Sequence, residues 1–172
     1  MALVLNEEQV MLRDAAAGFL SEKATVAHLR ALRDSGSESG FDVDTWKEMV
    51  EMGWAGIAIG EEFGGLGYGY TGLGLVLEQA GRNLSASPLQ SAVLVSATLI
   101  ERLGNKAQKE ALLPAIASGE TLVSLALQEG PHHAPENTAL AAVAAGDDYV
   151  LSGAKVLVQD AGTADSFIVV AR

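Results

Sequence analysis

The chain has 172 residues, a formal net charge of −11 and no cysteine. This length suits one domain, or one domain and part of a second. The acidic surplus would repel a phosphate backbone, so we expect no nucleic-acid partner. The absence of cysteine excludes disulfides and thiolate chemistry. Because 49% of the residues are hydrophobic and 19% are charged, the chain can bury a sizeable core.

Membrane and export signals are missing from the sequence. No apolar stretch reaches the ~18 residues that a membrane span needs. The first eight residues also lack the basic segment of a secretory signal. We therefore expect a cytoplasmic protein without a membrane span.

The N-terminal part predicts helices. Asn6 and Gln9 form a potential capping box, and apolar residues follow at helical spacing up to Leu20. A shorter helix is expected over residues 26–33, and the small polar residues 34–40 predict a loop.

Further helices are predicted after this loop. Asp44 is expected to cap the next helix, with Gly53 as its left-handed stop. Residues 54–59 are too short and too rich in glycine to classify. Thr71 is expected to open another helix, which buries Leu73, Val76, Leu77 and Ala80.

Two more helices are predicted before residue 120. A long one is expected from Ser85 to Leu103, with Gly104 as its stop. Asn105 and Gln108 form a second capping box, and that helix should run to about Ala117 with a kink or a lost hydrogen bond at Pro114.

The period of the apolar residues changes after Gly119. Strands are expected over residues 122–128 and 166–171, and residues 138–145 and 149–159 are expected to form a hairpin around the turn at 146–148. Helices first and strands second indicate an α+β fold: an all-helical domain at 1–120, then a partial antiparallel β-domain at 121–172. Because an open partial sheet leaves edges to be paired, we expect the chain to belong to something larger.

A glycine-rich loop at 61–69 leads into a formal G-x-G-x-x-G at Gly67, Gly69 and Gly72. In a Rossmann fold this spacing binds a dinucleotide such as NAD. Here no clear strand precedes Gly67, more helices follow, and Ala92 stands where an acidic residue is required. The pattern therefore favours a loop that needs positive φ at several positions.

The residues alone reveal no catalytic or metal site. Glu61 and Glu62 are adjacent and do not converge as an acid–base pair. His132 and His133 lack a third ligand, and His28 lies alone on a helix. We expect all of them to be surface or loop residues.

An ordered series of segments covers nearly the whole chain and comprises residues 6–9, 61–67 (Glu-Glu-Phe-Gly-Gly-Leu-Gly), 78–82, 103–109, 113–120, 146–155 and 164–172. This series resembles the acyl-CoA dehydrogenase family.

The resemblance implies a fold and a reaction. The fold is a helical domain, a middle β-domain and a C-terminal four-helix bundle, of which the bundle is absent from this chain. In the reaction, FAD accepts a hydride from an acyl-CoA while a glutamate removes the α-proton, and an electron-transfer flavoprotein takes the electrons. No position here matches the catalytic glutamate, so this chain alone should be inactive, and a homo- or hetero-oligomer is expected.

The resemblance also implies two flavin-binding segments in the β-domain. The family's Thr-Glu-Pro segment corresponds to Leu127-Gln128-Glu129, where Glu129 matches and Gln128 replaces a hydroxyl. The family's Lys-x-Trp-Ile-Thr-Asn segment reads Lys155-Val156-Leu157-Val158-Gln159-Asp160, where Leu157 replaces the aromatic residue and Gln159 the threonine. The predicted cofactor contacts are therefore Leu127, Gln128, Leu157, Val158 and Gln159.

These replacements also leave an alternative open. Paired dehydrogenases can include a member with eroded flavin contacts, so the chain is alternatively a non-catalytic partner subunit.

Overall fold

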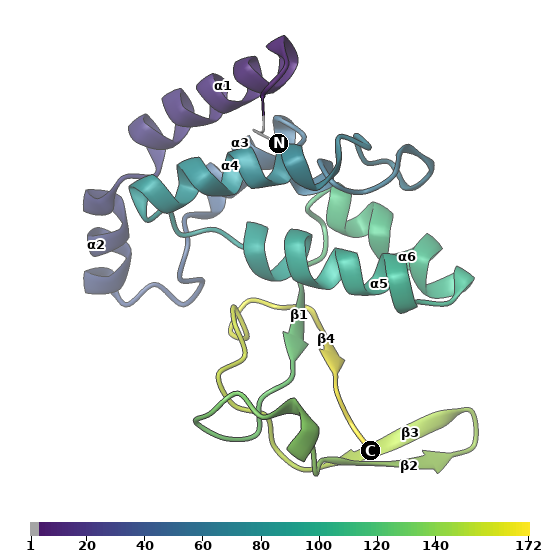
Figure 1. Cartoon of the computed structure of the whole chain (residues 1–172). Helices are drawn as coiled ribbons and strands as arrows, with labels where there is room; N and C mark the ends of the chain where they lie inside the picture. The colour runs from purple at the N-terminus through teal and green to yellow at the C-terminus, as the bar shows by residue number, and fades with distance from the viewer. Residues whose placement is uncertain (1–3) are drawn as a thin grey trace.

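The computed structural model describes residues 4–172, with helices first and strands afterwards (Figure 1). This order confirms the predicted α+β class. The helices are α1 (Glu7–Lys23), α2 (Val26–Ser35), α3 (Val43–Glu51), α4 (Gly69–Asn83), the π-helix η3 (Leu89–Ala97), α5 (Thr98–Leu103) and α6 (Lys106–Ala117), with short 3₁₀ turns η1 (Trp54–Gly56), η2 (Glu61–Phe63) and η4 (Pro135–Asn137).

The strands form two small sheets. The hairpin β2 (Ala141–Ala145) and β3 (Asp148–Ser152) is antiparallel, as predicted, but β1 (Val123–Ala126) and β4 (Ser166–Val169) pair in parallel. The prediction of a wholly antiparallel β-domain is therefore wrong for β1 and β4. The chain leaves β1, makes the hairpin and a long loop, and re-enters beside β1 in the same direction, as a parallel pair requires.

Local capping signals account for most helix starts. Both predicted capping boxes are present, at Asn6–Gln9 and at Asn105–Gln108. The predicted cap of α3 was wrong: Asp42, not Asp44, accepts a hydrogen bond from the Thr45 N–H at 2.7 Å. Asp44 instead lies in the first helical turn, where its negative charge interacts favourably with the positive end of the helix dipole.

Two other boundaries differ from the prediction. Helix α4 begins at Gly69, two residues before Thr71. The helix expected from Ser85 begins only at Leu89, because Leu84 ends α4 at φ 50° and residues 85–87 cross over outside helical structure.

The second hairpin strand is shorter than predicted. It ends at Ser152, although strand structure was expected as far as Gln159. Gly153 has a φ of 151°, and a Cβ there would lie 2.9 Å from Leu140 Cγ, so the position that follows the strand favours glycine. Residues 153–159 form a loop, and this loop carries three of the predicted cofactor contacts.

The glycine-rich loop is a folding element. Gly64, Gly67 and Gly69 adopt positive φ, which confirms the expectation from the sequence. The loop returns to residues 56–59 through backbone bonds from Leu66 N to Gly56 O and from Gly67 N to Ile59 O, both 2.9 Å.

The last glycine of the formal nucleotide pattern has a packing role. A Cβ on Gly72 would lie 2.2 Å from the Tyr68 ring. No strand precedes Gly67 among the described residues. The pattern is therefore explained by turns and close packing, and not by a dinucleotide-binding Rossmann site.

Two hydrophobic clusters form the core. The larger one joins α1, α3, α4 and η3 and includes Leu20, Met49, Trp54 and Val76. The smaller one lies beneath α5 and α6 and reaches Val123 of β1. The first strand is thereby anchored to the helices.

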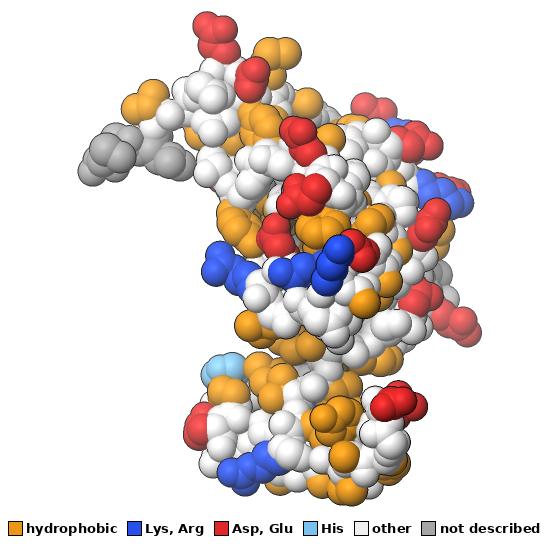
Figure 2. Space-filling model, turned by 90° about the vertical axis from the view of Figure 1, so that its right-hand side faces the viewer, with side chains coloured by type: hydrophobic (Ala, Val, Ile, Leu, Met, Phe, Trp, Pro, Cys, Tyr) orange, Lys and Arg blue, Asp and Glu red, His pale blue; other side chains and the backbone are white. Residues whose placement is uncertain are grey.

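The β part protrudes from the helical body as a smaller, partly apolar lobe (Figure 2). Val143, Tyr149, Val150 and Leu151 of its hairpin are exposed. None of the helices described between residues 4 and 172 combines the length and apolar character that crossing a membrane requires.

Two glycine-to-alanine substitutions should change the stability of the protein in opposite directions. A Cβ on Gly65 would lie 2.1 Å from Ile59 O, whereas Gly74 in α4 has open space around it. We predict that Gly65→Ala lowers the free energy of unfolding by about 2 kcal/mol. Gly74→Ala should raise it by about 0.5–1 kcal/mol. Urea titration followed by circular dichroism measures both changes, and an unaffected Gly65→Ala variant would contradict the close packing of this loop.

Candidate functional site

A partly buried ion pair joins the two predicted cofactor segments. Lys155 Nζ lies 2.6 Å from Glu129 Oε1, and the side chains are 6% and 22% exposed. The carboxylate also accepts hydrogen bonds from the N–H groups of Ala139 (2.8 Å) and Leu140 (3.0 Å). Three donors thus converge on one carboxylate.

The same lysine fixes the backbone of the first segment. Lys155 Nζ donates to Leu127 O at 3.1 Å, and the next residue, Val156, donates its N–H to Gln128 O at 2.8 Å. Residues far apart in the sequence are therefore held side by side. These bonds bring the two predicted cofactor segments into direct contact.

The hydrogen bonds to Glu129 lower its pKa. The Lys155 ammonium has the largest effect, followed by the N–H groups of Leu140 and Ala139, and together they bring the pKa to about 2 from an ordinary value of 4.5. The carboxylate is therefore charged at neutral pH.

The five predicted contacts do not line one common cavity. Leu127 lines an apolar groove of about 550 Å³ between α5, α6 and the β1–β4 pair, whereas Gln159 lines a different pocket. Gln128 Nε2 donates to His133 Nδ1 at 2.7 Å. Val158 is half-buried, and Leu157 is 76% exposed at a φ of 54°.

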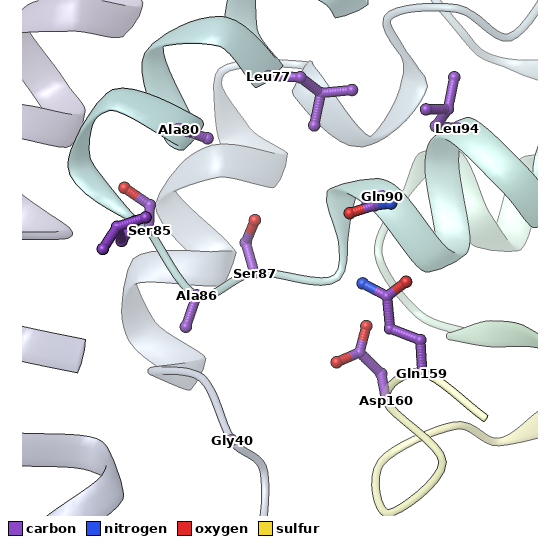
Figure 3. A pocket seen from close by; sticks show the side chains of 12 residues that line it. Gly40, Leu77, Ala80, Ser85, Ala86, Ser87, Gln90, Leu94, Gln159 and Asp160 are labelled. Carbon is purple, nitrogen blue, oxygen red and sulfur yellow. The ribbon is translucent and has the colours of Figure 1, made fainter. Parts of the chain in front are cut away.

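The pocket beside Gln159 has a volume of about 520 Å³ (Figure 3). One side is apolar and comes from the C-terminal half of α4 and from η3, through Leu77, Ala80 and Leu94. The side chains of Gln90, Gln159 and Asp160 face a common space in Figure 3. The pocket therefore suits a ligand with both an apolar and a polar part.

Sequence reasoning missed the contacts that attach this loop to the helices. Ser91 Oγ of η3 donates to Asp160 Oδ2, and Ser124 Oγ of β1 donates to Gln159 O. Asp160 also adopts a positive φ of 52°. No local signal in the sequence pairs Ser91 with a residue 69 positions away.

The residues expected to have no catalytic or metal role lie apart from this site or make ordinary contacts. Glu61 and Glu62 are exposed on η2. His28 Nδ1 lies 2.7 Å from Lys23 O. Within residues 4–172, no three groups of metal-ligating type come together.

A flavin ring offers two broad apolar faces and a polar edge, and the second segment has groups of both kinds. Leu157 presents an exposed apolar side chain, and the Gln159 side chain, which can both donate and accept hydrogen bonds, is exposed on the pocket wall. Gln128 fits less well because His133 already takes its amide. The donor set thus fits a flavin chiefly through residues 157–159.

Comparison with known proteins finds acyl-CoA dehydrogenases among the relatives of this chain. The family model for the acyl-CoA dehydrogenase N-terminal domain matches residues 6–120. Isovaleryl-CoA dehydrogenase of Bos taurus mitochondria is 34% identical over 172 residues, which cover 98% of this chain and 40% of that protein.

Solved structures agree with this result. The Tcur3481-Tcur3483 steroid ACAD is 33% identical, with a TM-score of 0.86 over 96% of this chain and 45% of that one. The ChsE4-ChsE5 complex from Mycobacterium tuberculosis is 25% identical, with a TM-score of 0.87 over 100% of this chain and 46% of that one. The chain spans less than half the length of these relatives.

The ion pair predicts a pH dependence of stability. Because the pKa of Glu129 is about 2 in the folded state and 4.5 without its partners, its stabilisation is complete above pH 4.5 and is lost as the pH falls from 4.5 to 2. Melting temperatures of wild type and Glu129→Gln should therefore converge below pH 4.5. Glu110→Gln, which removes an exposed pair with Lys106, is the control and should change little at any pH. A gap between wild type and Glu129→Gln that is constant from pH 7 to pH 3 would contradict this account.

The strained backbone at Leu157 makes a second prediction. An exposed leucine at positive φ costs roughly 1–2 kcal/mol, and asparagine tolerates this conformation better. We expect Leu157→Asn to raise the melting temperature by about 2–4 °C. Strain kept at an exposed apolar residue is typical of a binding site, so the same variant should bind a flavin less tightly. Differential scanning fluorimetry tests the first effect, and a lower melting temperature would show that Leu157 makes stabilising contacts instead.

Proposed function

This chain belongs to the acyl-CoA dehydrogenase family, and we propose that it is the N-terminal portion of an FAD-dependent enzyme that oxidises an acyl-CoA thioester to its trans-2-enoyl product. In this proposal residues 1–120 form the helical domain and residues 121–172 begin the middle β-domain. The supporting observation is the Glu129–Lys155 pair, which holds the two predicted flavin segments together beside an open pocket.

In the proposed reaction the residues of this chain bind and orient the flavin and the acyl group. Leu157 would cover one face of the flavin ring, and Gln159 would hydrogen-bond to its edge. Leu77, Ala80 and Leu94 would contact the apolar acyl group in the adjoining pocket. When bound, FAD supplies the hydride acceptor, while the base that removes the α-proton is expected from a part of the enzyme outside this chain.

Other properties follow from the family. We propose that the electrons pass to an electron-transfer flavoprotein and that the complete protein is a cytoplasmic homo- or hetero-oligomer. The ChsE4-ChsE5 relative is a complex of two differently named chains. This supports the proposal of a hetero-oligomer.

A non-catalytic partner subunit is the second candidate. Gln128 favours it, because the amide expected beside the flavin is bonded to His133. In this alternative the chain keeps the fold and the ion pair, and a homologous chain binds the flavin. Co-purification with a longer, flavin-containing homologue would support it.

Flavin binding and reduction separate these candidates. We expect the purified chain to bind FAD, and acyl-CoA should not bleach the flavin absorption because the base is elsewhere. Gln159→Leu should weaken FAD binding roughly fivefold, the effect of about 1 kcal/mol for one hydrogen bond. A chain that binds no FAD would favour the partner subunit, and bleaching by the chain alone would refute the missing base.

A further inference from the structure

The two cofactor segments keep two charged residues while their expected flavin contacts differ from the family. Gln128, Leu157 and Gln159 occupy positions where the resemblance expects other side chains, whereas Glu129 and Lys155 match it. The structure shows that these two matching residues are partners at 2.6 Å. The two segments therefore match the family pattern at the residues that contact each other, Glu129 and Lys155.

The pair controls backbone positions on three stretches of chain. Through Lys155 it holds the carbonyl of Leu127, and through Glu129 it holds the N–H groups of Ala139 and Leu140 at the entry to the hairpin. The neighbouring bond from Val156 N to Gln128 O then follows from this alignment. Leu157 directly follows Lys155 and Val156, the two residues held by these bonds.

Other attachments of the loop lie at its far end. Ser91 bonds Asp160 and Ser124 bonds the carbonyl of Gln159. Residues 157 and 158 therefore lie between two fixed points, the ion pair on one side and the two serines on the other. Moving either point would shift Leu157, whose φ of 54° is a conformation that a free leucine rarely adopts.

We propose that Glu129 and Lys155 are the positioning residues of the cofactor site: by fixing the distance between Leu127–Gln128 and Leu157–Gln159, the pair holds Leu157 and Gln159 where they can meet a flavin. The proposal rests on the proposed FAD function. It assigns the pair a role in geometry, because the desolvation of a partly buried ion pair offsets much of the attraction between its charges.

The best test removes both charges together. The double variant Glu129→Gln/Lys155→Met avoids leaving one unpaired charge inside the protein. Asp44→Asn/Lys47→Met is the matched control, because it removes an ion pair of 3.0 Å whose side chains are 86% and 66% exposed on α3. The single variant Lys155→Arg keeps Glu129 and a cation opposite it, and arginine has enough donors for both Glu129 and Leu127.

Three quantities are measured on the 172-residue chain. Hydrogen exchange at Leu140 and Val156 should accelerate about tenfold or more in the double variant, because their acceptors are no longer fixed. The dissociation constant for FAD should rise about tenfold, against less than twofold in the control, and Lys155→Arg should recover part of the loss. The melting temperature should fall by only a few degrees.

Each outcome decides the proposal. Unchanged exchange at Val156, or faster exchange with unaltered FAD affinity, overturns the positioning role. A fall in FAD affinity that merely follows global unfolding, without rescue by arginine, also overturns it. If the wild-type chain binds no FAD, the proposed function fails, and the exchange pattern alone decides whether the pair holds the two segments together.

Discussion

The contact between Glu129 and Lys155 is the constraint on which the candidate site depends. The β part is small: β1 pairs with β4 and β2 with β3, and the residues between them form loops. Such loops would be free to move if no tertiary contact fixed them. One carboxylate with three donors and one ammonium with two acceptors connect residues 127, 139–140 and 155, and this gives the loops a defined arrangement.

The helical body supplies the fixed frame for this arrangement. The glycine-rich loop folds back on residues 56–59, and Val123 of β1 packs in the cluster beneath α5 and α6. The π-helix η3 then presents Ser91 to the loop at Asp160 and Gln90 to the pocket. A π-helical stretch is uncommon and is often found at functional sites, and here it joins the frame to the candidate site.

Local signals in the sequence predicted the parts of the fold that depend on neighbouring residues. The capping boxes at Asn6 and Asn105 join groups three residues apart, and the turn at 146–148 needs only its own glycine. Predictions that needed distant partners were less successful. The parallel pairing of β1 with β4 depends on contacts between residues 43 positions apart, and the chain just after the end of β3 at Ser152 lies against Leu140 of the loop before β2.

The candidate site shows the same division. The resemblance predicted two flavin-binding segments, but it could not show that Glu129 bonds Lys155, that His133 takes the amide of Gln128, or that Leu157 adopts a positive φ. Leucine has no preference for that conformation, so no pattern predicts it.

In the proposed enzyme, residues 157–159 hold the flavin within a frame built by this chain. Hydrogen exchange of the wild-type chain with and without FAD shows whether they do, because each backbone amide reports its own protection. We expect slower exchange on adding FAD at residues 157–159 and little change in α1 to α3. Slower exchange confined to the helical body, or none anywhere, would contradict it.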